Sequence, residues 1–227
     1  MNTANFRPQI FLFIFFALTA GCKQSSIIQG HFADLEYHLT LFQNPQPKEG
    51  FPLLLVLHGT GDSGKEYLQL WKSEADRRKI VLLAPTLTRG YQKESADLKI
   101  FDQLIEEVSR RYPVNGEKIY LAGISSGALI ARWLLMNHPE RWKAVILIAS
   151  PGYESWTSRV DVETLPPILF VHGEKDEQFP IKQIEEHVKI LKEKGVETDL
   201  WRYPAGHEQK EEWSSDIFDW IENHSVR

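Results

Sequence analysis

The chain has 227 residues, of which 42% are hydrophobic and 25% charged, and its formal net charge is −5 with both signs interspersed. This is the balance of an ordinary globular protein, and without a basic excess it excludes nucleic-acid binding through a positively charged surface. The length allows one or two domains.

Residues 1–21 have the features of a signal peptide. Arg7 supplies a positive charge, and the run from Ile10 to Ala20 is almost entirely apolar but too short to span a bilayer as a mature helix. The run ends at Leu18-Thr19-Ala20-Gly21-Cys22, which resembles the lipobox of bacterial lipoproteins. The resemblance implies that Cys22 becomes the lipidated first residue of a protein anchored to a membrane of the cell envelope.

Cys22 is also the only cysteine of the chain. A protein bound for an oxidising compartment with no possible internal disulfide is unusual, and a lipid-modified cysteine explains both facts. The alternatives are a plain secretory signal cut nearby and an uncleaved anchor. By resemblance to Gram-negative sorting rules, Lys23 favours the outer membrane. We expect a polar tether over residues 22–30 and one domain over residues 31–227.

Apolar strands and amphipathic helices alternate along this domain. One or two half-buried strands are expected within residues 31–42, where apolar side chains occupy alternate positions. Six further strands are expected at 53–57, 80–84, 119–123, 144–149, 168–173 and 198–203. Helices are expected around 67–78 and at 96–112, 128–136, 181–194 and 213–222. This alternation predicts a single α/β domain with a mostly parallel, doubly wound sheet.

Gly123-Ile124-Ser125-Ser126-Gly127 joins one of these strands to the helix that follows it. The Gly-X-Ser-X-Gly pattern in this context predicts a nucleophile elbow with the Ser125 hydroxyl exposed at a tight turn. Gly123 and Gly127 flank the serine where a Cβ would crowd the strand against the helix. Ser126 does not fit the pattern, because Ile124 and Ala128 occupy its flanking positions.

A serine hydroxyl becomes a good nucleophile when a base takes its proton and an acid orients that base. In the chain order serine, acid, histidine, Asp176 follows the strand at 168–173 and His207 follows the strand at 198–203. Ligand sites of open parallel sheets lie at the carboxyl ends of the strands. We therefore predict a triad of Ser125, Asp176 and His207.

Rival residues exist for both partners of the serine. His58 and His172 precede glycines at strand ends and could line the site, but they come before the acid, which is the wrong order for the base. The remaining histidines are expected at the surface: His31, His38, His138, His187 and His224. The rival acids are Glu174, Glu177, Asp161 and Glu163.

Two backbone amides are predicted to form an oxyanion hole. One is the N–H of Ser126, at the start of the helix after the elbow. The other is the N–H of Thr60, in the glycine-rich loop 58–64, where glycines let the backbone approach a substrate oxygen. This loop is not a phosphate-binding P-loop, because Glu66 follows Lys65 where that pattern needs Ser or Thr. Such donors contribute on the order of 3 kcal/mol each in the transition state.

From Phe51 to Trp220 the chain resembles the α/β-hydrolase superfamily, and within it the small secreted esterases grouped with polyhydroxybutyrate depolymerases, feruloyl esterases and the phospholipase/carboxylesterase family. The residues that carry the resemblance are His58-Gly59, Asp97 with Phe101 ahead of Arg111-Tyr112-Pro113-Val114, Lys118 to Gly127, His172 to Asp176, and Gly206-His207. Ala128 stands where those esterases usually have a second glycine.

The resemblance implies a serine esterase that acts through an acyl-enzyme on small or extended esters and needs no metal or organic cofactor. A peptidase or thioesterase of the same fold, and a non-catalytic envelope binding protein, remain alternatives. Residues 151–167 are long enough only for a small flap. Trp133 and Trp220 are expected in the core, while three other tryptophans could reach the rim of the site: Trp156, Trp201 and Trp213.

Overall fold

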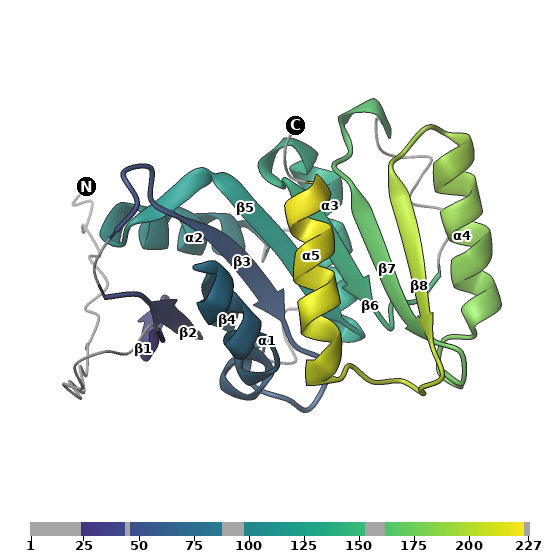
Figure 1. Cartoon of the computed structure of the whole chain (residues 1–227), viewed down its shortest axis with the longest axis horizontal. Helices are drawn as coiled ribbons and strands as arrows, with labels where there is room; N and C mark the ends of the chain where they lie inside the picture. The colour runs from purple at the N-terminus through teal and green to yellow at the C-terminus, as the bar shows by residue number, and fades with distance from the viewer. Residues whose placement is uncertain (1–23, 44–45, 88–97, 153–161, 225–227) are drawn as a thin grey trace, which may run out of the picture.

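The computed structural model describes residues 24–43, 46–87, 98–152 and 162–224. One eight-stranded sheet runs through the molecule in the order β1-β2-β4-β3-β5-β6-β7-β8 (Figure 1). The strands are β1 (Ser26–Phe32), β2 (Leu35–Leu41), β3 (Phe51–Leu57), β4 (Val81–Pro85), β5 (Val114–Ile124), β6 (Ala144–Ile148), β7 (Ile168–Gly173) and β8 (Thr198–Tyr203). The pairs β1–β2 and β2–β4 are antiparallel, and all other pairs are parallel.

Helices cover both faces of the sheet. They are α1 (Gly64–Arg78), α2 (Lys99–Arg111), α3 (Ser126–Asn137), α4 (Ile181–Glu193) and α5 (Ser214–His224). Side chains of α2, α3 and α4 form one core with one face, and side chains of α1 and α5 form a second core with the other. Alternate residues of β3 therefore enter different cores, Leu53 and Leu55 on one side and Leu54 and Val56 on the other. This two-sided burial explains the uninterrupted apolar runs in the sequence.

The predicted α/β fold is confirmed, and the expected strands and helices are present, with ends shifted by a few residues. The prediction of a tether over 22–30 is wrong for its second half. Residues 26–30 belong to β1, which pairs along its whole length with β2, where Ile28 lies opposite Leu39. Residues 26–30 are few and include both polar and apolar side chains, so their pattern does not predict a strand. Their pairing with β2 makes them one.

Three further expectations about burial are wrong. His38 and His187 are buried, at 5% and 1% exposure, although both were expected at the surface. His38 lies on a strand covered from both sides, and His187 lies on the inner face of α4, with its ring 5.5 Å from that of Phe170. Trp133, expected in the core, is 45% exposed on α3, whereas Trp220 is buried as expected.

Several sequence predictions fall outside the described residues: the signal peptide with Cys22, Asp97, Asp161, and most of the expected flap with Trp156. Among the helices in the described ranges, none is both long enough and apolar enough to cross a membrane.

Candidate active site

Ser125 lies at a strained turn between β5 and α3. Its φ of 54° and ψ of −116° are a combination that residues with a Cβ rarely adopt. The turn is held from both sides, because the Ser125 N–H donates to Ile148 O of β6 at 3.0 Å and its carbonyl accepts from Leu129 N of α3. The strain is therefore stabilised by the strands and the helix that meet there.

The two glycines of the elbow lie where no side chain would fit. A Cβ at Gly127 would be 2.1 Å from Leu57 O on β3, and one at Gly123 would be 2.4 Å from Gly127 O. Both contacts are with backbone, which cannot move aside as a flexible side chain could. The start of α3 therefore packs directly on the ends of β3 and β5, and this close packing turns Ser125 away from the sheet.

The structure brings Ser125, His207 and Asp176 together in one hydrogen-bonded chain. His207 Nε2 lies 2.8 Å from Ser125 Oγ, and His207 Nδ1 lies 2.8 Å from Asp176 Oδ2. A carboxylate only accepts, so Nδ1 carries the proton and Nε2 accepts from the serine hydroxyl. The three residues follow β5, β8 and β7; β7 and β8 are neighbours in the sheet, and β6 lies between β5 and β7.

The Asp176 carboxylate is fully buried, and backbone amides replace the water it has lost. Its second oxygen, Oδ1, accepts from the N–H groups of Gln178 and Phe179 at 2.9 Å each. These donors leave Oδ2 for the imidazole. The rival acids Glu174, Glu177 and Glu163 are exposed and are not part of this chain of hydrogen bonds.

The loop after β3 lies against the elbow. A Cβ added to Gly59 would lie in van der Waals contact with Ser125, 3.6 Å from its Cβ, so the backbone of this loop runs close to the serine. Next to Gly59, Thr60 Oγ1 donates to Ser126 Oγ at 3.0 Å. The two residues predicted to supply the oxyanion amides are thus neighbours across the site, from segments 66 positions apart in the chain.

His58 and His172, which could have lined the site, are instead buried behind it. His58 Nδ1–H donates to Gly59 O, while Nε2 accepts from Leu87 N, both at 2.7 Å. The second of these bonds ties the loop after β3 to the segment that follows β4. Burial lowers the pKa of both histidines below the ordinary value, so each is neutral at physiological pH.

One contact near the site has no signal in the sequence. Tyr67 on α1 donates from its hydroxyl to Gln209 Oε1 at 2.6 Å, 142 residues away, and burial raises the pKa of Tyr67. The bond ties the loop of His207 to the helix that follows the Thr60 loop. No motif relates these two residues, so only the tertiary structure shows the pairing. Trp213, which could have reached the rim of the site, is buried and stacks on Tyr203 at the end of β8, with the ring centres 4.2 Å apart.

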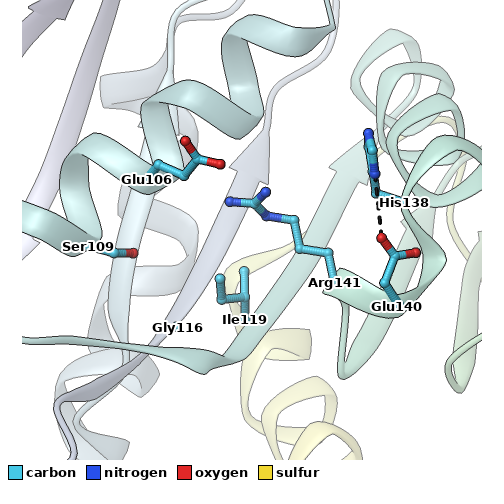
Figure 2. Close-up of a pocket in the computed structure, with 7 residues that line it drawn as sticks. All are labelled: Glu106, Ser109, Gly116, Ile119, His138, Glu140 and Arg141. Carbon is cyan, nitrogen blue, oxygen red and sulfur yellow. Dashed lines mark ion pairs between the residues drawn. The ribbon is translucent and has the colours of Figure 1, made fainter.

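A cavity of about 400 Å³ lies at the opposite, amino-terminal edge of the sheet (Figure 2). Its lining includes Ile119 of β5, the strand that leads to Ser125. Ile119 is six residues before Ser125, which is roughly 20 Å along an extended strand. Figure 2 shows the side chains of Glu106 and Arg141 pointing toward one another, with His138 paired to Glu140 at 3.5 Å. This cavity is separate from the Ser125 site.

Comparisons with known proteins agree with this architecture. The prolyl oligopeptidase family matches residues 150–226, the part that carries Asp176 and His207. Among solved structures, a thermostable esterase superimposes with a TM-score of 0.69 at 20% identity, covering 88% of this chain and 63% of its own. A fluorophosphonate-binding serine hydrolase of Staphylococcus aureus gives 0.71 at 12% identity, covering 90% and 100%. The chain therefore has the α/β-hydrolase fold.

Three curated relatives differ in the bond that their names say they act on. The uncharacterized peptidase YuxL of Bacillus subtilis is 26% identical over 72% of this chain and 32% of its own length. A bifunctional acetylxylan esterase/xylanase of Neocallimastix patriciarum is 25% identical over 61% and 21%, and acyl-protein thioesterase 1 of Eremothecium gossypii is 27% identical over 56% and 66%. The chain thus spans between a fifth and two thirds of the length of these relatives.

Proposed function

We propose that this protein is a serine hydrolase that cleaves carboxylic esters through an acyl-enzyme intermediate. The observation that carries the proposal is the hydrogen-bonded chain from Ser125 through His207 to Asp176, at distances of 2.8 Å, beginning at a strained elbow. A buried acid, an imidazole with a fixed tautomer and a partly exposed serine together meet the requirements of nucleophilic acyl transfer.

Each of these groups has a distinct part in the reaction. Ser125 Oγ attacks the acyl carbon while His207 Nε2 takes its proton, and Asp176 stabilises the imidazolium that forms. The negative oxygen of the tetrahedral intermediate accepts from the amides of Thr60 and Ser126. His207 then protonates the departing alkoxide, and a water molecule, activated by the same imidazole, releases the acid and restores Ser125.

An ester substrate is favoured over a peptide by two arguments. The acetylxylan esterase relative is named for an ester bond, and the sequence resembles small secreted esterases. An alkoxide also leaves a tetrahedral intermediate more readily than an amine. Ester cleavage therefore depends less on protonation of the leaving group by His207 than peptide cleavage does. Peptide and thioester cleavage, which the names of two other relatives indicate, are the alternative activities of the same site.

The test is hydrolysis of p-nitrophenyl acetate together with labelling by a fluorophosphonate probe. The protein should hydrolyse the ester and become labelled at Ser125, and Ser125→Ala should lower kcat by about 10⁵- to 10⁶-fold and abolish labelling. Ser126→Ala, which keeps its backbone amide, is the matched control and should retain most activity. Unchanged turnover in Ser125→Ala, or a wild-type protein that does neither reaction, would contradict the proposal, and the latter would favour a binding protein.

We also propose that Cys22 anchors this hydrolase to a membrane of the cell envelope. Residue 25, only three positions further on, is already attached to the domain, since the Ser25 N–H and hydroxyl both donate to Asp76 Oδ1 of α1. Such an anchor would hold the domain close to the membrane. In cells grown with an alkyne-labelled fatty acid, the wild-type protein should carry the label and Cys22→Ser should not. Label retained by Cys22→Ser would refute the anchor.

A further inference from the structure

His172 is a buried histidine next to the acid, outside the chain of hydrogen bonds that activates Ser125. It lies near the end of β7 with 1% of its surface exposed. Its Nε2 is 2.7 Å from Phe179 O, and because a carbonyl only accepts, this nitrogen carries a hydrogen. The same nitrogen is 3.5 Å from Asp176 Oδ2, the oxygen that binds His207.

Phe179 links His172 to both the acid and the base. Its N–H donates to Asp176 Oδ1 at 2.9 Å, and its C=O accepts from His172. Its ring packs edge-on against His207, with the ring centres 5.3 Å apart at 65°. A displacement of this one residue would therefore change the position of Asp176 and the packing of His207 together.

His172 donates to Phe179 O as a neutral imidazole. Burial lowers its pKa below the ordinary value, although Asp176 acts in the opposite direction. Across the sheet, its register partner Arg202 is ion-paired with Glu185 of α4 at 2.8 Å. A positive charge on His172 would compete with His207 for Asp176 Oδ2, so the neutral Nε2–H form preserves the orientation of the acid.

We propose that His172 is a positioning residue for Asp176, because its bond to Phe179 O holds the loop whose amides bind one carboxylate oxygen and direct the other at His207. The inference rests on the proposed serine hydrolase activity. It assigns a role to a histidine that precedes the acid in the chain and cannot be the base, since its Nε2–H is directed at Phe179 and Asp176 rather than at Ser125.

The first experiment compares His172→Leu with His172→Gln in p-nitrophenyl acetate hydrolysis. Leucine fills the space without a donor, and kcat should fall about 10- to 100-fold with KM changed less than about twofold, since the loss is one of orientation. Glutamine keeps a neutral N–H donor and should restore kcat to within about fivefold of the wild type. His187→Leu, also a buried histidine but on α4, is the matched control and should leave kcat unchanged.

A double-mutant cycle separates positioning from a general structural effect. If His172 acts through the carboxylate, His172→Leu should lower kcat less than about twofold in an Asp176→Asn background. A full second loss in that background, or wild-type kcat in His172→Leu, would overturn the inference. If thermal unfolding shows that His172→Leu is not folded, His172→Asn replaces it. The asparagine side chain is too short for its N–H to reach Phe179 O, so the same loss of kcat is expected.

The two proposals fail in different ways. Loss of the serine hydrolase assignment would appear as activity independent of Ser125. An enzyme that needs Ser125 and Asp176 but tolerates His172→Leu in the wild-type background would refute only the role of His172.

Discussion

The two edges of the sheet hold the same kinds of side chain in different arrangements. At the carboxyl edge, Ser125, His207 and Asp176 form an uninterrupted chain of 2.8 Å contacts. At the amino edge, His138 lies 3.5 Å from Asp102, and the Ser109 hydroxyl has no hydrogen-bond partner within the part of the chain that the structure describes. A serine, a histidine and an aspartate near one another are therefore not sufficient for an activated nucleophile.

The backbone explains the difference. Ser109 lies within α2, with regular helical geometry, whereas Ser125 is held at positive φ between a strand and a helix. Asp176 is fully buried and held by amides, which leaves one oxygen for the imidazole, whereas Asp102 is paired with Arg141 at 3.1 Å. A guanidinium competes with an imidazole for the carboxylate, and an amide in a fixed loop orients it.

The largest difference in kcat between the two edges should come from substitution of their aspartates. Asp176→Asn removes the charge that stabilises the imidazolium and disturbs the tautomer of His207, so kcat for p-nitrophenyl acetate should fall on the order of 10⁴-fold. Asp102→Asn, at the amino edge, should change kcat less than about twofold, since its ionic partners are Arg141 and His138 rather than the residues of the triad. Comparable losses in the two variants would remove the distinction between the edges.

Two glycines provide the next comparison. Gly127→Ala places a Cβ 2.1 Å from Leu57 O, so α3 must move off β3, and we expect a loss of about 3 kcal/mol or more in unfolding free energy with misplacement of Ser125. Gly116→Ala, beside the amino-edge cavity, meets no atom within 4 Å and should be tolerated. Urea unfolding and ester hydrolysis of both variants measure this, and a stable, active Gly127→Ala would contradict the packing argument.

A smaller effect should follow acidification. His58 and His172 at the carboxyl edge have pKa values lowered by burial, although Asp62 and Glu66 beside His58 and Asp176 beside His172 act in the opposite direction. The unfolded chain therefore binds more protons below about pH 6.5, and stability should fall as the pH drops through that value.

Hydrogen exchange locates this acid effect. After correction for intrinsic rates, exchange in residues 173–180 should accelerate between about pH 7 and about pH 5, because protonation of His172 weakens the native state locally. Residues 138–141 at the amino edge, where His138 is half exposed, should show little change. Equal acceleration at both edges would show that the buried histidines are not its cause.

The smallest effect is expected from Arg141→Met at the amino edge. The substitution removes the partly buried ion pair with Asp102 and should lower the unfolding free energy by about 1 kcal/mol. Ester hydrolysis should be unchanged, as measured with p-nitrophenyl acetate. A clear loss of kcat would link the amino-edge cavity to the catalytic edge and would require a coupling through β5.

Much of the fold was predictable, since the apolar runs of β3, β6 and β7 need helices on both faces, and the prediction from that pattern is confirmed. The failures share one cause. At residues 26–30, His38, His187 and Trp133, the chemical character of the side chains does not decide between core and surface. The packing of neighbouring helices and strands decides whether these positions are buried.

The sequence by itself determined the order of the strands and helices and the residues Ser125, Asp176 and His207, because periodicity and a local motif are written in neighbouring positions. Only the tertiary structure decided that His58 and His172 lie behind the site and that Tyr67 bonds Gln209. It also decided which of the two polar clusters, at the carboxyl and amino edges of the sheet, contains a serine hydrogen-bonded to its histidine. The physical reason is that hydrogen bonds of 2.8 Å depend on where separate strands end in space, and that spacing is set by the packing of the whole sheet.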